Sequence, residues 1–231
     1  MRNSFITEGI VLSRTDFGES DRVLTVITSD SGKLRIIAKG VRKPKSKLAG
    51  GIELLSVNSL TVLPGRGELD TLISSRLITS FCNIIGDLDR TMTSYNLLKR
   101  MNKATEDAVD GEYFQVLRGA LQGLDKTEVP INLTELWFNV HFLSVSGHLP
   151  NIRRDIDGHM LEPSNNYSFD FEHMAFREER KGTFNANHIK LLRLAYIAEY
   201  PQKLCQVTDI NTYIDKVLQL SANLVRLNHQ V

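Results

Sequence analysis

The sequence has 231 residues, of which 42% are hydrophobic and 24% are charged, a composition that is ordinary for a soluble globular protein. This length allows one large domain or two small ones, and it is sufficient to bury a sizeable core. The formal net charge of +1 says nothing about a polyanionic partner, so that information has to come from where the charges lie.

Cysteine count and hydropathy exclude several classes of protein. Cys82 and Cys205 are too few for a disulfide framework or a four-thiolate zinc site, and their spacing matches no metal motif. The N-terminal segment has no apolar stretch of signal-peptide length, and no window reaches the roughly 18 apolar residues of a membrane span. We therefore expect a cytoplasmic protein with reduced cysteines.

Residues 5–80 contain five β-like segments that are separated by turn signals. The segments are residues 5–14, 22–28, 33–39, 52–63 and 69–81. Their regular spacing and the absence of a helical period favour a small closed or sandwich-like β-domain. A five-stranded barrel of the oligonucleotide-binding (OB) type fits this count.

Residues 32–51 form a basic segment with seven lysines and arginines and no acidic residue. Its first part alternates at a period of two, so that charged side chains fall on one strand face and Leu34, Ile36 and Ala38 fall on the other. Gly40 ends this strand, and a loop around Pro44 follows. The cations that we expect to bind an anion are Lys33, Arg35, Lys39, Arg42, Lys43, Lys45 and Lys47.

The anion that best fits the basic segment is a nucleic-acid backbone, and a merely solvated loop is the alternative interpretation. Residues 1–80 hold 12 basic and 8 acidic side chains, whereas residues 81–231 hold 16 and 19, so the positive excess lies in the first part. Arg66, on a separate turn, is either a further phosphate contact or a solvated turn residue. Glu19 and Asp21 resemble a carboxylate pair, but without a basic or metal partner we interpret them as turn-stabilising.

Aromatic residues are absent between Phe17 and Phe81. Proteins that grip single strands by stacking need aromatic platforms, each worth roughly 1–3 kcal/mol per base. The basic segment therefore predicts sequence-independent binding to the phosphate backbone that tolerates single and double strands and weakens steeply with salt. Annealing is consistent with such a surface, because it screens the repulsion between two strands without occupying their base edges.

From Asp87 the hydrophobic period becomes helical, with Asp87 itself as the expected N-cap. We expect helices over residues 87–106, 112–124, 133–147, 186–200 and 209–227. The apolar stripe of the first helix is expected to hold Leu88, Met92, Tyr95, Leu98 or Leu97, and Met101. Most of the aromatic cluster around Trp137 is expected in the core.

The predicted architecture is α+β, with an N-terminal five-stranded OB-type barrel followed by an all-helical domain. We place the barrel domain at residues 1–82 and the helical domain at residues 83–231, with the boundary between Phe81 and Asp87. A loop-rich insert at about 150–184 interrupts the helices, with a short hairpin near residues 167–171.

Several short motifs occur together in the order and spacing of a known family. They are Val11-Leu12, Asp16-Phe17-Gly18-Glu19-Ser20-Asp21-Arg22, Gly32-Lys33, Ala38-Lys39-Gly40-Val41-Arg42, Lys45-Ser46, Leu48-Ala49-Gly50 and, in the second half, Gly147-His148-Leu149-Pro150. In these motifs the chain resembles the bacterial recombination mediator family RecO, strongly over residues 1–80 and weakly after 150. The resemblance implies an OB barrel followed by a helical domain.

The same resemblance implies a function and a set of partners. Family members are non-enzymatic DNA repair proteins, associated with the nucleoid, that bind single- and double-stranded DNA and anneal complementary strands. They pair with RecR, engage the acidic tail of single-strand-binding protein and help to load the RecA recombinase. A dock for that tail needs an apolar pocket rimmed by cations. The candidates are Arg118 with Leu121 and, separately, Lys99 with Arg100.

The chain departs from the family pattern at one place. Many relatives carry a four-cysteine zinc module after the Gly-x-x-Pro motif, but no cysteine occurs here between Cys82 and Cys205. The nearby residues that offer metal ligands are His148, His159, His173, Asp155 and Asp157. Their irregular spacing favours loop packing without a metal, so we expect no metal and no cofactor.

Two other functions are compatible with the basic segment. An RNA-binding OB-fold protein would use the same loop, and a non-catalytic protein-interaction adaptor would leave it solvated. The sequence has no Gly-rich phosphate loop, no HExxH or GxSxG motif and no acid cluster suited to two metals, which argues against an enzyme.

Overall fold

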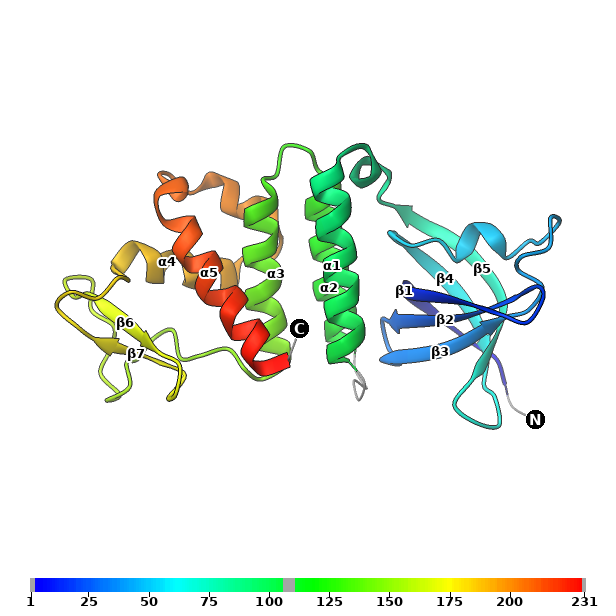
Figure 1. Ribbon diagram of the computed structural model, residues 1–231, viewed down its shortest axis with the longest axis horizontal. Coiled ribbons are helices and arrows are strands. Elements are labelled where there is room, and N and C mark those ends of the chain that lie inside the picture. The colour runs from blue at the N-terminus through cyan, green and yellow to red at the C-terminus, as the bar shows by residue number, and fades with distance from the viewer. Residues whose placement is uncertain (1–2, 106–110, 230–231) are drawn as a thin grey trace. The chain divides into compact units, whose positions relative to one another are not determined.

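Figure 1 shows the computed structural model, which describes residues 3–105 and 111–229. The chain divides into two compact units, Met1–Thr127 and Glu128–Val231. The first unit holds a closed five-stranded barrel and two helices, and the second holds three helices and a hairpin. The predicted α+β class with an N-terminal barrel is confirmed. Among the described residues, no helix has the length and apolar character to cross a membrane.

The barrel strands follow the five predicted segments. They are β1 (Phe5–Phe17), β2 (Asp21–Thr28), β3 (Lys33–Ala38), β4 (Ser56–Leu63) and β5 (Asp70–Ser80), with a short 3-10 helix η1 (Ala49–Gly51) before β4. Their order around the barrel is β1-β2-β3-β5-β4, and β3 and β5 are the parallel pair. This is the topology of the OB fold, and Figure 1 shows the curled strands.

The barrel closes because β1 pairs with two strands in succession. Its first half pairs with β4 and its second half with β2, and a bulge between Val11 and Ser13 bends it between the two partners. Gly9 lies where both pairings overlap. A Cβ atom there would lie 2.6 Å from a methyl carbon of Val26 and 2.9 Å from one of Leu60, so the interior has no room for a side chain.

The predicted alternation of β3 is present in the barrel. Ile36 and Ala38 are fully buried in the barrel core, and Leu34 packs against that core. Arg35 points outward, and its side chain is 60% exposed. The basic side chains of this strand are therefore presented on the outer surface because their apolar neighbours fill the interior.

Two helices complete the first unit: α1 (Leu88–Ala104) and α2 (Glu112–Asp125), preceded by the short 3-10 helix η2 (Cys82–Gly86). Both helices contact β1. The expected N-cap is confirmed, because the Asp87 side chain accepts a hydrogen bond from the amide of Arg90 at 3.0 Å. Glu106, at the end of the predicted helix, lies outside the described residues. The last barrel strand ends at Ser80.

The prediction for the buried face of α1 was wrong at three positions. Leu88, Met92 and Tyr95 are 75%, 56% and 46% exposed. The later members of the predicted stripe are buried, because the buried face of the helix consists of Arg90, Ser94, Leu97, Leu98 and Met101. Arg90 explains the difference, because its guanidinium donates to the carbonyl oxygens at the end of α2 and so holds a charged residue inward.

The second unit is built on α3 (Ile131–Val145), α4 (Ala186–Ile197) and α5 (Ile210–His229), with a short 3-10 helix η3 (Pro201–Gln206). Each of the three helices contacts the other two. The predicted aromatic core is confirmed, because Trp137, Phe138 and Phe142 are at most 3% exposed. The indole of Trp137 donates to the carbonyl oxygen of Ala198 at 2.7 Å, which satisfies its buried N–H group.

The predicted hairpin in the insert is also present, as β6 (Tyr167–Asp170) and β7 (Ala175–Glu178). Aromatic rings hold it together. Phe176 lies edge-to-face against Phe169 and Phe184, with ring centroids 5.1 and 5.7 Å apart, and against Tyr167. These contacts give the insert a small apolar core of its own.

Candidate nucleic-acid interface

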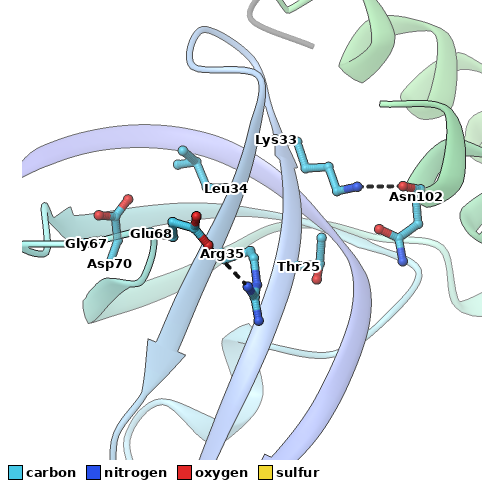
Figure 2. A pocket seen from close by; sticks show the side chains of 8 residues that line it. All are labelled: Thr25, Lys33, Leu34, Arg35, Gly67, Glu68, Asp70 and Asn102. Atoms are coloured by element: carbon cyan, nitrogen blue, oxygen red, sulfur yellow. Dashed lines mark hydrogen bonds and ion pairs between the residues drawn. The ribbon is translucent and has the colours of Figure 1, made fainter. Parts of the chain in front are cut away.

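A hollow of about 640 Å³ lies on the outer surface of the barrel, against β2, β3 and the turn that leads into β5. Figure 2 shows its lining. The lining residues are Thr25, Lys33, Leu34, Arg35, Gly67, Glu68, Asp70 and Asn102. In OB folds the face of strands 2 and 3, together with the loops after strands 1 and 4, contacts oligonucleotides. The hollow therefore lies where a strand would be expected to run.

Lys33 has a structural contact within this hollow. Its ammonium donates to the carbonyl oxygen of Asn102 at 2.6 Å, as Figure 2 shows. Asn102 lies in the last turn of α1, whose final carbonyl groups have no partners within the helix. Lys33 therefore caps the C-terminus of α1, a position that a cation favours.

Arg35 is more available than Lys33. Its guanidinium lies 3.9 Å from the carboxylate of Glu68, and the two side chains are 60% and 92% exposed. An exposed pair at this distance stabilises a fold by little, because water and salt screen it. The guanidinium can therefore exchange Glu68 for a phosphate group.

The basic loop, residues 39–47, is held on the barrel at a few points only. Val41 is 4% exposed and belongs to the barrel core. The amide of Arg42 donates to the carbonyl oxygen of Ser20 at 2.9 Å, and the amide of Gly40 donates to the carboxylate of Asp21 at 2.7 Å. The predicted structural role of Asp21 is thereby confirmed. The five cations of this loop, Lys39, Arg42, Lys43, Lys45 and Lys47, are all exposed.

Asp16 is the acidic residue placed among these cations. Its carboxylate accepts from Arg22 at 2.7 Å and lies 3.5 Å from the guanidinium of Arg42. The hydrogen bond from Arg22, and then the charge of Arg42, lower the pKa of Asp16 below its ordinary value. The carboxylate therefore stays ionised at neutral pH and orients both arginines at the edge of the basic loop.

Arg66 is exposed on the turn between β4 and β5. The amide of Gly65 donates to the carboxylate of Asp70 at 2.9 Å, which closes this turn. A Cβ atom on Gly65 would lie 2.0 Å from the carbonyl oxygen of Leu69, so this turn requires glycine. Arg66 is thus carried on a defined turn at the rim of the barrel.

The four partner-binding candidates lie in different environments. Leu121 is completely buried, and Arg118 lies 3.5 Å from the carboxylate of Glu8. Lys99 is exposed and Arg100 is half-buried. Lys99 follows the exposed side chains of Leu88, Met92 and Tyr95 along the same face of α1, one turn after Tyr95. We call these three apolar residues, together with Ile85 on η2, the α1 stripe.

The insert brings three of the candidate metal ligands together. Ligand atoms of Asp155, Asp157 and His159 lie within 4.8 Å of one another. The Asp155 carboxylate, however, already accepts from the amides of Asp157 and His159 at 3.0 and 2.8 Å. These bonds explain its burial as a turn-forming residue. A four-thiolate zinc site does not fit this insert, because its sequence has no cysteine and its hairpin is held by aromatic packing.

Phe17 is an aromatic residue of the β1–β2 hairpin that was not among the predicted site residues. It is the last residue of β1 and is 55% exposed, directly before the turn that binds the basic loop. Its signal in the sequence was an aromatic side chain beside the glycine of a charged turn.

Comparison with known proteins agrees with this geometry. The family described as "Recombination protein O N terminal" matches residues 1–81. DNA repair protein RecO of Dehalococcoides mccartyi strain 195 is 32% identical over 169 residues, which are 72% of this chain and 66% of that protein. DNA repair protein RecO of Listeria welshimeri is 30% identical over 209 residues, which are 82% of this chain and 76% of that protein. The matched part of the Dehalococcoides relative is thus just under two thirds of its length.

The fold and the candidate site define an OB-barrel protein with a helical unit and a cluster of exposed cations in the loop that follows β3. The similarity to the curated relatives extends beyond the barrel into the second unit. The chain belongs to the RecO family, as its motifs indicate.

Proposed function

We propose that this protein is a DNA repair and recombination mediator that binds single- and double-stranded DNA through the phosphate backbone and anneals complementary strands. It assists the loading of the RecA recombinase on DNA coated with single-strand-binding protein, and it does so without catalysis, in the cytoplasm at the nucleoid. The observation that carries this proposal is the basic loop, which presents five exposed cations and is anchored in the barrel core by Val41. The relatives named DNA repair protein RecO support it.

The proposed mechanism is counterion release. Lysine and arginine side chains that contact phosphates displace condensed counterions, which drives binding at low salt and does not depend on base sequence. In this proposal the DNA follows the basic loop and reaches Arg35 and Arg66 on the outer surface of the barrel. Lys33 contributes its charge to the local field while it caps α1.

Annealing follows from the same surface. Two complementary strands repel each other through their phosphates, and cations that neutralise those phosphates lower the repulsion while the base edges stay accessible. RecR is a further proposed partner, through which the mediator acts together with RecA.

The tail of single-strand-binding protein is the third proposed partner, and we place its dock on the α1 stripe. That tail is acidic with an apolar end, so it needs exposed apolar side chains beside a cation. Leu88, Met92 and Tyr95 supply the exposed apolar side chains, and Lys99, one turn later, supplies the cation. Arg118 and Leu121 fit this role less well, because one lies beside Glu8 and the other is buried.

A salt titration tests the DNA-binding proposal. We expect replacement of Lys43, Lys45 and Lys47 with alanine to flatten the slope of log K against log salt by roughly 0.7–0.9 for each lost contact. The measurement is equilibrium binding of a labelled single-stranded oligonucleotide at several salt concentrations. Because no apolar contact is removed, the unfolding midpoint should not change.

The matched control removes three exposed lysines from the second unit: Lys181, Lys190 and Lys203. It changes the net charge by the same amount and should leave the slope unchanged. Equal slopes for wild type and the basic-loop variant would place the DNA elsewhere. Competition by RNA of equal length distinguishes the RNA-binding alternative, because readout of the 2′-hydroxyl would give RNA an advantage that phosphate contacts alone do not.

A further inference from the structure

Phe17 is a large apolar side chain at the surface of the barrel, 55% exposed at the end of β1. A single exposed apolar residue is ordinary in a soluble protein, so its exposure alone has no functional meaning. Its surroundings distinguish it from the other exposed apolar residues of the barrel. It lies next to the turn that contacts the basic loop, whereas Ile6, 69% exposed, lies at the opposite end of the same strand.

The position of Phe17 relative to the basic loop is fixed by hydrogen bonds. Phe17 pairs with Asp21 across the β1–β2 hairpin. The Asp21 carboxylate accepts from the amide of Gly40, and the carbonyl oxygen of Ser20 accepts from the amide of Arg42, at 2.7 and 2.9 Å. Gly18, with φ of +57°, begins the turn. The end of β1 that carries Phe17 is therefore tied to the start of the basic loop.

The charges around the ring favour a polyanion on balance. Asp16, its neighbour in the chain, is paired with Arg22 and Arg42. Asp21 is occupied by the amide of Gly40. Glu19 is an exposed acid on the turn, and it is outnumbered by the five cations of the basic loop. A phosphate backbone that follows this loop thus meets net positive charge next to an exposed ring.

The strand register also places Phe17 on the face that carries Arg35. Ser13 lies opposite Thr25, and Thr25 lies opposite Arg35, so the three share one face of the sheet. Side chains alternate along β1, and Phe17, four residues after Ser13, points to that same face. Phe17 therefore lies on the outer face of the sheet that also carries Arg35.

We propose that Phe17 is a base-stacking platform for single-stranded DNA and that it gives the interface a preference for single strands over duplex. This inference rests on the proposed DNA-binding function and deepens it. A phenyl ring stacks on any unpaired base, so it adds affinity without sequence preference. The bases of a duplex are already stacked and paired, so they gain nothing from the ring. The basic segment alone predicts contacts to the phosphate backbone of DNA, and this proposal adds one aromatic contact to a base.

The first experiment compares Phe17→Ala with wild type on an oligo-dT strand and on a duplex of equal length at one salt concentration. We expect the dissociation constant for the single strand to rise about tenfold and that for the duplex to change less than about twofold. Phe17→Tyr keeps an aromatic face and should bind both like wild type. Ile6→Ala, the control for removing exposed apolar surface from β1, should also leave both constants unchanged.

The second experiment places a reporter at the ring. Trp137 is the one tryptophan of the sequence and is 3% exposed in the second unit. Its emission, recorded from the wild-type protein, is the background signal of the experiment. The emission that Phe17→Trp adds should be quenched by oligo-dT, because the indole would stack on a base, and should be largely unaffected by duplex. This readout remains decisive if Phe17→Ala does not fold.

The outcomes separate the inference from the function on which it rests. If wild type binds neither DNA, the proposed function fails. If wild type binds both, while Phe17→Ala weakens both equally or neither and the new tryptophan is not quenched, DNA binding stands and the stacking role is wrong. Selective weakening on single strands together with selective quenching supports the proposal.

Discussion

At the scale of single residues, two cations of the first unit complete the ends of its helices. Arg90 is 7% exposed, and its guanidinium donates to the carbonyl oxygens of Leu124, Lys126 and Thr127 at 2.9, 3.2 and 2.8 Å. These carbonyls lie at the C-terminus of α2, where the helix itself offers no donors. Lys33 does the same for α1 through Asn102. Two charged residues thus serve the fold of the first unit.

Replacing Arg90 with alanine should therefore destabilise the first unit. The change leaves buried carbonyl groups without a donor and opens a void, which we expect to lower the free energy of unfolding by about 3 kcal/mol. Urea denaturation followed by circular dichroism measures this loss. Lys99→Ala, an exposed change on the same helix, should cost less than about 0.5 kcal/mol. Similar stabilities for the two variants would refute the capping role of Arg90.

At the scale of elements, α1 presents two apolar faces. One face is buried and contains Leu97, Leu98 and Met101. The other face carries the exposed α1 stripe. The amphipathic pattern alone could not decide between them, because both contain apolar residues at helical spacing. The contact between Arg90 and the end of α2 decides which face turns inward.

The exposed stripe predicts where an acidic peptide with an apolar end will bind. We expect Met92→Ser and Lys99→Ala each to weaken binding of a labelled tail peptide of single-strand-binding protein by about fivefold or more, because each removes a central contact. Fluorescence anisotropy measures the affinity. Arg118→Ala is the control and should bind like wild type. The reverse pattern, with loss only in Arg118→Ala, would move the dock to α2.

At the scale of the whole molecule, the two units differ in their titratable groups. All six histidines lie beyond residue 128, in the second unit. Burial lowers the pKa of His141, His188 and His229 below the ordinary value, and for His141 the carbonyl oxygens of Ala198 and Ala195 oppose this shift in part. The folded state thus binds fewer protons than the unfolded state. The resulting stability is present above the unfolded pKa and is lost as the pH falls from there through the folded pKa.

We therefore expect acidification to destabilise the second unit selectively. Between about pH 7.5 and about pH 5.5, the range in which histidine titrates, the unfolding midpoint followed by Trp137 fluorescence should fall. Protection of the barrel amides from hydrogen exchange should change less. His141→Gln should weaken this pH dependence. A midpoint independent of pH would contradict the assignment.

Much of the architecture could be predicted because its signals are local. The five strands, the N-cap at Asp87 and the hairpin at Tyr167 each depend on residues within a few positions of one another. The exposed basic segment was visible for the same reason, since charge and alternation lie in one short stretch. The face of α1 was not predictable, because it depends on a contact with residues more than 30 positions away.

The sequence by itself determined the fold class, the family and the charge of the candidate interface. Only the tertiary structure decided which of those charges are available. Lys33 is tied to a carbonyl group 69 residues away, while the basic loop is held at the surface by Val41 and the β1–β2 turn. The tertiary structure also places the end of β1, with Phe17, next to the turn that contacts the basic loop. Local patterns specify elements, but contacts between distant residues set which side chains face water and which are used in the fold.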